Sequence, residues 1–323
     1  MKRIQFTTLG GPEVLEIVEG EVPRPGPGQV LLRQEAVGLN FIDTYYRTGS
    51  YPAELPSGIG NEAAGVVEAV GEGVTEFKAG DRVGYPPGPL GAYASHRAVD
   101  AARLVHIPAG ISSEQAAAAM LKGCTAEYLI ERCARVTPGQ TVLVHAAAGG
   151  VGSILVQWLK TIGATVIAHS GNAEKAAIAA SLGADHALQG PFDTLAGEVR
   201  RLTGGEGVEA VIDGVGQASW AASLASVAKR GIIVTYGNAS GPVPPFSALD
   251  LLRAGSIFVT RPSLADYCGT VEELRASASR LFELMLSGAV QVQVGARYPL
   301  DQAAEAQRAL EARETTGSTV LIP

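Results

Sequence analysis

The chain has few of the residues that build disulfide frameworks or metal clusters. Its 323 residues include three cysteines, Cys124, Cys133 and Cys268, and none of them forms a C-x-x-C pair. An odd, widely spaced set argues against a disulfide framework and against a cysteine-rich zinc site. The histidines are also scattered and lack an H-x-x-x-H spacing; they are His96, His106, His145, His169 and His186.

Charged residues and long apolar runs are scarce as well. Charged side chains make up 18% of the chain and the net charge is −7, which disfavours a general binder of nucleic-acid phosphates. No apolar run reaches membrane-spanning length, and Met1–Phe6 does not begin a signal peptide, so we expect a cytoplasmic protein. The 46% of apolar residues and the length are typical of a globular protein with two domains.

What the chain does have is glycine, with 40 residues spread along its length, and one glycine-containing stretch is informative. The apolar run Thr141–Val144 predicts a buried strand, Ala146–Gly152 a glycine-rich turn, and the residues up to Gly163 a helix. A strand, a glycine turn and a helix N-terminus together form a pyrophosphate site, because backbone N–H groups and the helix dipole face the ligand. The fingerprint A-x-x-G-x-x-G on its own does not prove such a site, and the alternative interpretation is a glycine turn that only packs a helix against a sheet.

The two parts of the chain have different patterns. Residues 1–120 carry short β-type runs broken by Gly and Pro, which predicts a mostly antiparallel, barrel-like domain. From residue 121 strands alternate with helices, which predicts a parallel sheet covered on both faces. We expect this α/β domain to span 121–264 and the tail, 265–323, to return to the first domain.

The sequence after the second strand of the α/β domain favours NADPH over NADH. An acidic residue about 20 positions past the glycines would bind the ribose hydroxyls of NAD. The window Ala168–Asn172 has no carboxylate, and Lys175 follows it, which suits a 2′-phosphate. An ordinary exposed helix lysine is the alternative interpretation of Lys175.

Several ordered motifs together resemble one family. They are Asn40–Tyr46 (NFIDTYY), Gly60–Gly65 (GNEAAG), Gly80–Val83 (GDRV), His145–Gly152 (HAAAGGVG), Asp213–Gly216 (DGVG), Tyr236–Asn238 (YGN) and Arg261–Leu264 (RPSL). Over nearly its whole length the chain resembles the zinc-independent, zeta-crystallin-like NADPH:quinone oxidoreductases of the medium-chain dehydrogenase/reductase superfamily. The resemblance implies a discontinuous GroES-like catalytic domain, 1–120 and 265–323, and an inserted Rossmann domain, 121–264. It also implies a cofactor cleft between them and a homodimer or tetramer paired through the Rossmann domain.

The chain departs from zinc-dependent relatives at the metal position. Those relatives carry a cysteine where Asn40 stands and a histidine where Asn61 stands, and asparagine is a poor zinc ligand. Glu62 and Asp43 remain, but two carboxylates do not make a zinc cage. We therefore predict no catalytic or structural zinc.

The resemblance also implies a set of cofactor contacts. Beside the nicotinamide we expect Asn40, Phe41, Ile42, Asp43, Thr44, Tyr45 and Tyr128. The pyrophosphate is expected at Gly149, Gly150, Val151 and Gly152, and the 2′-phosphate at Ser170, Gly171, Asn172 and Lys175. The nicotinamide half is expected to contact Tyr236, Gly237, Asn238, Ala239, Pro262, Ser263, Leu264 and, from the C-terminal segment, Gly317. Relatives carry a tyrosine where Gly190 aligns, so that contact is missing from the set.

Without a metal the reaction needs an acceptor that is already electrophilic, and a quinone qualifies. Hydrogen-bond donors at the developing oxyanion would assist, and Asn40, Tyr45 and Tyr51 are the candidate catalytic residues. The tyrosines could instead only pack the wall of the site. Two other functions stay open: an NADPH-dependent enone reductase, and a non-catalytic NADPH-binding protein of an RNA-binding or crystallin-like kind, whose RNA-binding version the acidic charge disfavours.

Overall fold

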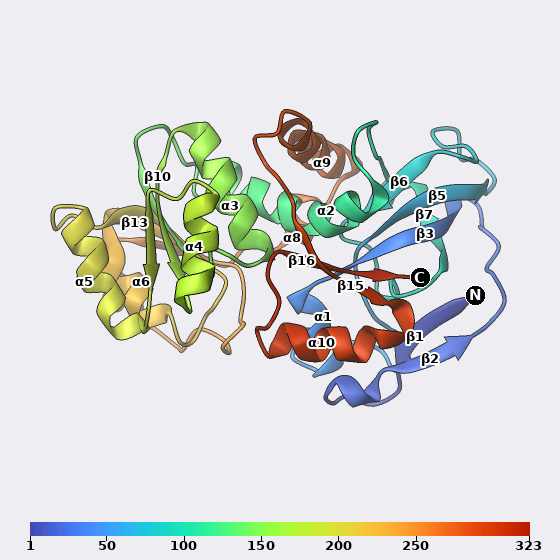
Figure 1. Cartoon of the computed structure of the whole chain (residues 1–323), viewed down its shortest axis with the longest axis horizontal. Coiled ribbons are helices and arrows are strands. Elements are labelled where there is room, and N and C mark those ends of the chain that lie inside the picture. Colours follow the sequence, from blue (N-terminus) through green and yellow to red (C-terminus); the bar gives the residue numbers. More distant parts are fainter. The chain divides into compact units, whose positions relative to one another are not determined.

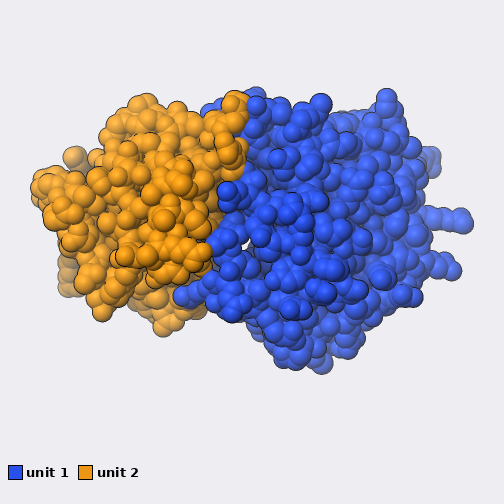
Figure 2. All heavy atoms as spheres, in the orientation of Figure 1, with its two compact units in different colours: residues 1–124, 268–286, 292–323 blue, residues 125–267, 287–291 orange.

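The computed structural model describes residues 1–323 and divides the chain into two compact units, coloured separately in Figure 2. The first comprises Met1–Cys124, Cys268–Leu286 and Val292–Pro323; the second comprises Thr125–Tyr267 and Ser287–Gln291. The short segment Ser287–Gln291 was expected in the first unit. It belongs to the second because the amide of Gln157 donates to the Gln291 carbonyl at 3.1 Å and accepts from the Gln291 N–H at 2.8 Å.

The first unit is built on a seven-stranded sheet and a small three-stranded sheet (Figure 1). Its strands are β1 (Lys2–Phe6), β2 (Glu16–Glu19), β3 (Gln29–Leu39), β4 (Ser57–Gly58), β5 (Ala63–Val70), β6 (Arg82–Tyr85), β7 (His96–Asp100), β8 (Val105–His106), β15 (Val294–Pro299) and β16 (Ser318–Ile322). The large sheet has the order β15-β16-β3-β5-β6-β8, with β7 paired to β3. Its pairs are antiparallel apart from β15 and β16, and the C-terminal strand β16 lies directly beside β3.

Helices and short 3₁₀ turns complete this unit. They are α1 (Phe41–Arg47), α9 (Val271–Leu286), α10 (Ala303–Glu311), η1 (Pro12–Val14), η2 (Ala101–Arg103) and η4 (Leu300–Gln302), and α2 (Ser113–Glu127) runs from this unit into the next. No helix of the structure combines the length and the apolar character that a membrane span requires.

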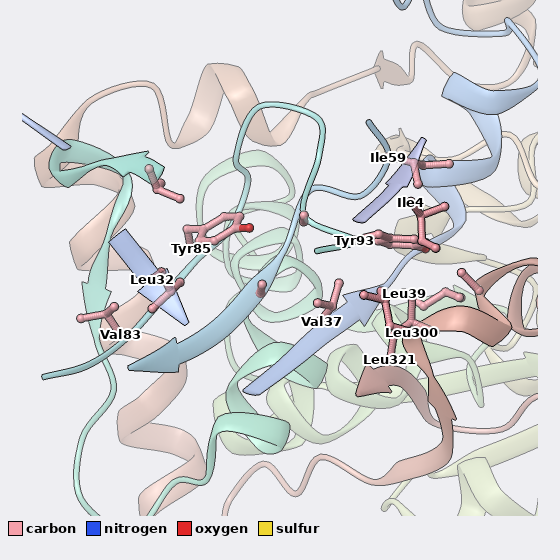
Figure 3. Close-up of a cluster of buried hydrophobic side chains, with 14 of the residues drawn as sticks. Ile4, Leu32, Val37, Leu39, Ile59, Val83, Tyr85, Tyr93, Leu300 and Leu321 are labelled. Atoms are coloured by element: carbon pink, nitrogen blue, oxygen red, sulfur yellow. The ribbon is translucent and has the colours of Figure 1, made fainter. Parts of the chain in front are cut away.

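The core of the first unit fixes the end of β3. Side chains from both chain ends pack together there, among them Leu39 of β3, Leu300 and Leu321 (Figure 3). Leu39 is 1% exposed, and burial of a leucine side chain contributes about 2 kcal/mol. Because Asn40 follows Leu39 directly, the apolar core sets where the next helix, α1, begins.

The second unit is a six-stranded parallel sheet with the order β11-β10-β9-β12-β13-β14. Its strands are β9 (Thr141–His145), β10 (Thr165–Ser170), β11 (His186–Gln189), β12 (Val208–Asp213), β13 (Val227–Thr235) and β14 (Phe258–Thr260). Its helices are α3 (Gly150–Ile162), α4 (Ala173–Ser181), α5 (Phe192–Leu202), α6 (Trp220–Ser226), α7 (Ala248–Arg253) and α8 (Leu264–Tyr267), with a π-helix, η3 (Tyr128–Cys133), after α2.

The strand order places a binding crevice at one edge of this sheet. From β9 the chain builds outward through β10 and β11 on one side, then crosses to β12 on the other side. At such a switch point the loops after the two neighbouring strands diverge, and ligands bind at the carboxyl ends of the strands. The carboxyl ends of β9 and β12 are His145 and Asp213, so the glycine turn lies at this point.

Candidate active site

The glycine turn has the geometry that a pyrophosphate needs. The Gly149 N–H donates to the Ala146 carbonyl at 2.9 Å, and α3 begins at Gly150. A Cβ at Gly152 would lie 2.2 Å from the Ala146 oxygen and 2.8 Å from the Ala147 Cα, both backbone atoms, so only glycine fits. The first amides of α3 have no partner inside the helix, which leaves them to an anion.

The loop after β10 presents a capped helix start and open space. The Asn172 side-chain oxygen accepts from the Lys175 N–H at 2.9 Å and caps α4, while a Cβ at Gly171 would contact nothing within 4 Å. Ser170 is 2% exposed and its hydroxyl donates to the Lys175 carbonyl at 3.4 Å, so this side chain faces inward. Lys175 is the third residue of α4, directly after Glu174, and is half-buried; its contact with a 2′-phosphate stays a prediction.

The remaining predicted contacts of the second unit lie at the same edge of the sheet. Tyr236–Ala239 follow β13 and Pro262–Leu264 follow β14, so both segments emerge at carboxyl ends of parallel strands. The chains pack closely here, since a Cβ at Gly237 would lie 2.4 Å from the Gly214 carbonyl oxygen. The structure thus brings the loops after β9, β10, β13 and β14 to one edge, as a dinucleotide site requires.

Tyr128 begins the π-helix η3 and is almost fully buried. Its ring stacks on Tyr267 with centroids 4.8 Å apart and an interplanar angle of 15°. The Tyr267 ring also lies under the Arg132 guanidinium at 5.0 Å, and Arg132 donates to the Tyr267 carbonyl at 2.7 Å. Local π-helices occur often at functional sites, and this one fixes Tyr128 against the segment that follows Leu264.

In the first unit Asn40 directly follows β3 and caps α1, a short helix that the sequence did not predict, and the predicted residues 41–45 lie on this helix. Its buried side chains are Asp43, Thr44 and Arg47, while Phe41 and Tyr45 lie on the other side with ring centroids 5.6 Å apart. The Tyr45 and Tyr51 rings lie 5.2 Å apart, and the Tyr51 N–H donates to the Tyr45 carbonyl at 3.0 Å. Tyr45 and Tyr51 therefore form one half-buried aromatic cluster.

Gly317 joins this part of the site through the sheet. It directly precedes β16, in which Thr319 pairs with Leu39 of β3. The antiparallel register places Gly317 at the end of the sheet where β3 leads into α1. Its φ of +64° is in the left-handed region, and a Cβ there would lie 2.8 Å from the Gln293 carbonyl oxygen.

Asp43 is completely buried and holds three hydrogen bonds. Its carboxylate accepts from the Asn40 N–H, the Asn61 side-chain amide and the Tyr93 hydroxyl, each at 2.9 Å. Burial raises the pKa of Asp43 to about 6, although these three donors and the Lys122 charge oppose the rise. The carboxylate that was expected at the cofactor is thus engaged inside the unit.

Asn40 is paired with a second buried carboxylate. Its amide nitrogen donates to Glu62 at 2.8 Å and to the Gly38 carbonyl at 3.4 Å. Glu62 also accepts from the Leu121 N–H at 2.6 Å and has the Lys122 ammonium 3.6 Å away. Burial raises the pKa of Glu62, against the opposing effects of Lys122, the Leu121 N–H and Asn40.

These contacts engage the Asn40 amide inside the unit. Its nitrogen has two N–H groups; one donates to Glu62 at 2.8 Å, and a long contact of 3.4 Å joins the nitrogen to the Gly38 carbonyl. The roles of Asn40, Tyr45 and Tyr51 as donors to an oxyanion stay a prediction, and the two tyrosines carry O–H groups suited to it. No group of three or more His, Cys, Asp or Glu side chains converges to hold a metal ion.

A Ser-His-Asp arrangement at the end of β9 is structural. The Ser223 hydroxyl donates to Asp213 at 2.8 Å, so its oxygen accepts the Nε2–H of His145 at 2.9 Å. Asp213 lies 4.0 Å from that imidazole nitrogen and also accepts from Ser219. Burial lowers the pKa of His145 to about 4 against the Asp213 charge, so the ring is neutral; all of these side chains are fully buried.

Sequence reasoning missed the residues that hold α1 from outside. Tyr93, Gln307 and Lys122 contact the predicted residues or their partners, and all are buried. None belongs to a motif of the resemblance. The only signal available was their type, because polar side chains in otherwise apolar or alanine-rich segments need partners when buried.

Fold and site together define a class: a dinucleotide-binding oxidoreductase with a β-rich partner unit. Residues 26–138 match the family model of the alcohol dehydrogenase GroES-like domain, and residues 150–283 match that of the zinc-binding dehydrogenases. The chain belongs to the quinone oxidoreductase family within the medium-chain dehydrogenases/reductases. The predicted fold class, a GroES-like domain plus a Rossmann domain, is confirmed.

Three similar proteins illustrate this membership. A quinone oxidoreductase of Pseudomonas aeruginosa is 49% identical over 323 residues, which cover 100% of this chain and 99% of that protein. The structure of Escherichia coli quinone oxidoreductase complexed with NADPH superposes with a TM-score of 0.96 at 44% identity and covers 100% of both chains. A 2-haloacrylate reductase of a Burkholderia species is 42% identical, covering 97% of this chain and 96% of that protein.

Proposed function

We propose that the protein is an NADPH-dependent quinone reductase that works without zinc. The observation that carries this proposal is the sheet edge of the second unit, where a glycine-only turn lies beside the end of β10, and the segment Ala168–Asn172 there has no carboxylate and is followed by Lys175 in the first turn of α4. Membership in a family whose relatives are named quinone oxidoreductases, one of them solved with NADPH, supports the same conclusion.

The residues present fit NADPH, which would supply the hydride. The amides at Gly150–Gly152 would hold the pyrophosphate, and the Lys175 ammonium the 2′-phosphate. The loops Tyr236–Ala239 and Pro262–Leu264 would orient the nicotinamide half. In the first unit, the hydroxyl of Tyr45 or Tyr51 would donate a hydrogen bond to the acceptor oxygen as charge develops there.

Reduction of an activated carbon–carbon double bond is the second candidate. The full-length similarity to a 2-haloacrylate reductase favours it, because an α,β-unsaturated acceptor takes a hydride with the same cofactor geometry. The two candidates differ in acceptor and share the proposed residues.

A substrate panel tests both candidates. NADPH oxidation would be followed at 340 nm with benzoquinones, naphthoquinones, phenanthrenequinone, enones and 2-chloroacrylate, before and after dialysis against a chelator. We expect turnover with quinones, unchanged by chelation. Turnover with enones or 2-chloroacrylate alone would favour the second candidate, and NADPH binding without any oxidation would favour a non-catalytic protein.

We also propose that the first unit, close to the expected 1–120 and 265–323, acts as the catalytic domain, and that the second, close to the expected 121–264, acts as the cofactor domain. We propose as well that two chains pair through the second unit. Strand β14 is the edge of the parallel sheet, and the large apolar side chains on and near it are exposed. Phe258 is 63% exposed, and Leu252 and Leu249 of α7 are 60% and 57% exposed. An unpaired edge strand with apolar neighbours is a surface that a second copy can extend by pairing strand to strand.

A further inference from the structure

Helix α1 carries Tyr45 yet has little to stabilise it by itself. It contains seven residues, and helices shorter than about 12 residues are marginal in water. The side that it buries is polar, since Asp43, Thr44 and Arg47 point inward. The position of α1 therefore depends on hydrogen bonds and an ion pair more than on apolar packing.

The two ends of α1 are held by different partners. At the N-terminal end, Asp43 accepts from Tyr93 and Asn61. At the C-terminal end, Arg47 is 1% exposed; its guanidinium donates to the Gly10 carbonyl at 3.1 Å and to the side chains of Gln307 and Glu311, both of α10, at 2.5 Å. Figure 1 places α1 beside α10.

One contact joins the two ends. The Gln307 amide nitrogen donates to the Tyr93 hydroxyl at 3.4 Å, while its oxygen accepts from Arg47. The side chains of Asp43, Tyr93, Gln307 and Arg47 thus form a buried hydrogen-bonded chain, and the one turn of α1 between Asp43 and Arg47 closes it into a ring. Since Asp43 and Arg47 are four residues apart, the ring fixes both the position and the rotation of the helix.

We infer that Tyr93 and Gln307 are positioning residues for the reduction: they touch neither substrate nor cofactor and act by holding α1 so that Tyr45, on its opposite side, keeps its orientation. The expected effect on the rate of reduction rests on the proposed function. The claim that the two residues hold α1 in place rests on the ring of contacts alone, and neither residue belongs to the predicted site.

The chain offers a matched control for Tyr93. Tyr85 is also fully buried in the same core, and its hydroxyl donates to Gln34 at 2.6 Å, away from α1; Figure 3 labels both tyrosines. Tyr93→Phe and Tyr85→Phe each remove one buried hydroxyl with a side-chain acceptor. The Tyr85 hydroxyl also accepts from Arg97 at 3.2 Å, as the Tyr93 hydroxyl accepts from Gln307, but only Tyr93→Phe opens the ring. The free energy of unfolding of both variants is measured as well, so that general destabilisation is separated from the local effect.

The first readout does not require activity. Hydrogen exchange of the amides of residues 41–51 would be measured by mass spectrometry in the wild type and both variants, below the onset of unfolding. We expect exchange in this segment to speed up at least about tenfold in Tyr93→Phe and to stay at the wild-type rate in Tyr85→Phe. Equal exchange in both variants would overturn the inference.

The second readout is kinetic. In Tyr93→Phe we expect kcat for quinone reduction to fall about tenfold while the dissociation constant for NADPH stays within about twofold, because misplaced groups slow the reaction more than they weaken binding elsewhere. Tyr85→Phe should keep the wild-type kcat. If Tyr93→Phe keeps it too, the inference is wrong.

A second variant keeps the test available if Tyr93→Phe does not fold. Gln307→Leu breaks the ring between Tyr93 and Arg47 but leaves the Tyr93–Asp43 bond, and should give the same pattern of exchange and kcat. A wild type that is inactive with every quinone would refute the proposed function, whereas the exchange comparison would still decide the positioning role.

Discussion

Asp43 gives a prediction whose size follows from its burial. Its pKa is raised to about 6 in the folded protein from 3.8, because burial outweighs its three hydrogen bonds. The difference corresponds to about 3 kcal/mol, since one pKa unit is worth about 1.4 kcal/mol. Between these two values the folded state holds a proton that the unfolded state has lost, so the contribution of Asp43 to stability is greatest below pH 3.8 and falls as the pH rises through 6.

The variant Asp43→Asn removes this pH dependence. The substitution also destabilises the protein by an amount that does not change with pH. This amount does not affect the test, because the quantity followed is how the difference in the free energy of unfolding between variant and wild type changes with pH. Relative to the wild type, the variant should gain on the order of 1 kcal/mol between pH 5 and pH 8, about half of the full effect. Urea unfolding followed by far-UV circular dichroism at four pH values would measure it, since both tryptophans, Trp158 and Trp220, lie in the second unit and Asp43 lies in the first.

A surface carboxylate provides the control. Slight burial raises the pKa of Asp185, but Lys160 and the Val166 N–H outweigh it and the net pKa is lowered. Asp185→Asn should therefore differ from the wild type by a constant amount between pH 5 and pH 8. If the difference in the free energy of unfolding between Asp43→Asn and the wild type is also constant over this range, the argument that burial dominates the pKa of Asp43 is refuted.

Three further predictions concern the cofactor, the acceptor and the assembly. Lys175→Glu should weaken NADPH binding at least about tenfold more than NADH binding in a fluorescence titration, because it puts a carboxylate at the 2′-phosphate; equal losses would count against the site. Tyr45→Phe should slow turnover about three- to tenfold without abolishing it in a steady-state quinone assay, since hydride transfer needs no obligatory acid; no change, or complete loss, would contradict a graded role. Phe258→Glu should shift the sedimentation coefficient from dimer to monomer, because a charge is buried if β14 pairs with its copy; an unchanged dimer would exclude this edge.

The sequence predicted the second unit more closely than the first. Strand, turn and helix around Gly152 follow directly from the apolar run and the glycines, and α3 ends at Ile162, directly before Gly163, whose φ is +88°. In this unit the sequence pattern of each element reflects its place in the fold. A buried parallel strand has a continuous apolar run, and a helix that packs on the sheet has one apolar face.

Helix α1 could not be predicted in the same way. Periodicity analysis looks for an apolar stripe, whereas the buried side of α1 consists of Asp43, Thr44 and Arg47. Strand β15 was missed for a related reason: it is an edge strand whose residues are at most partly buried, so it has no apolar run. Partners distant in sequence, such as Gln307, become visible only when the fold is known.

The pairing of Asn40 with Glu62 and of Asn61 with Asp43 bears on how such a protein could change over evolution. A cysteine at 40 or a histidine at 61 would take the amide partner from one interior carboxylate. Glu62 would keep the Leu121 N–H and the Lys122 charge, and Asp43 would keep the Asn40 N–H and the Tyr93 hydroxyl. Each change would still remove one hydrogen bond to a buried carboxylate, at a cost of about 1–3 kcal/mol, so the core constrains positions 40 and 61 independently of any ligand.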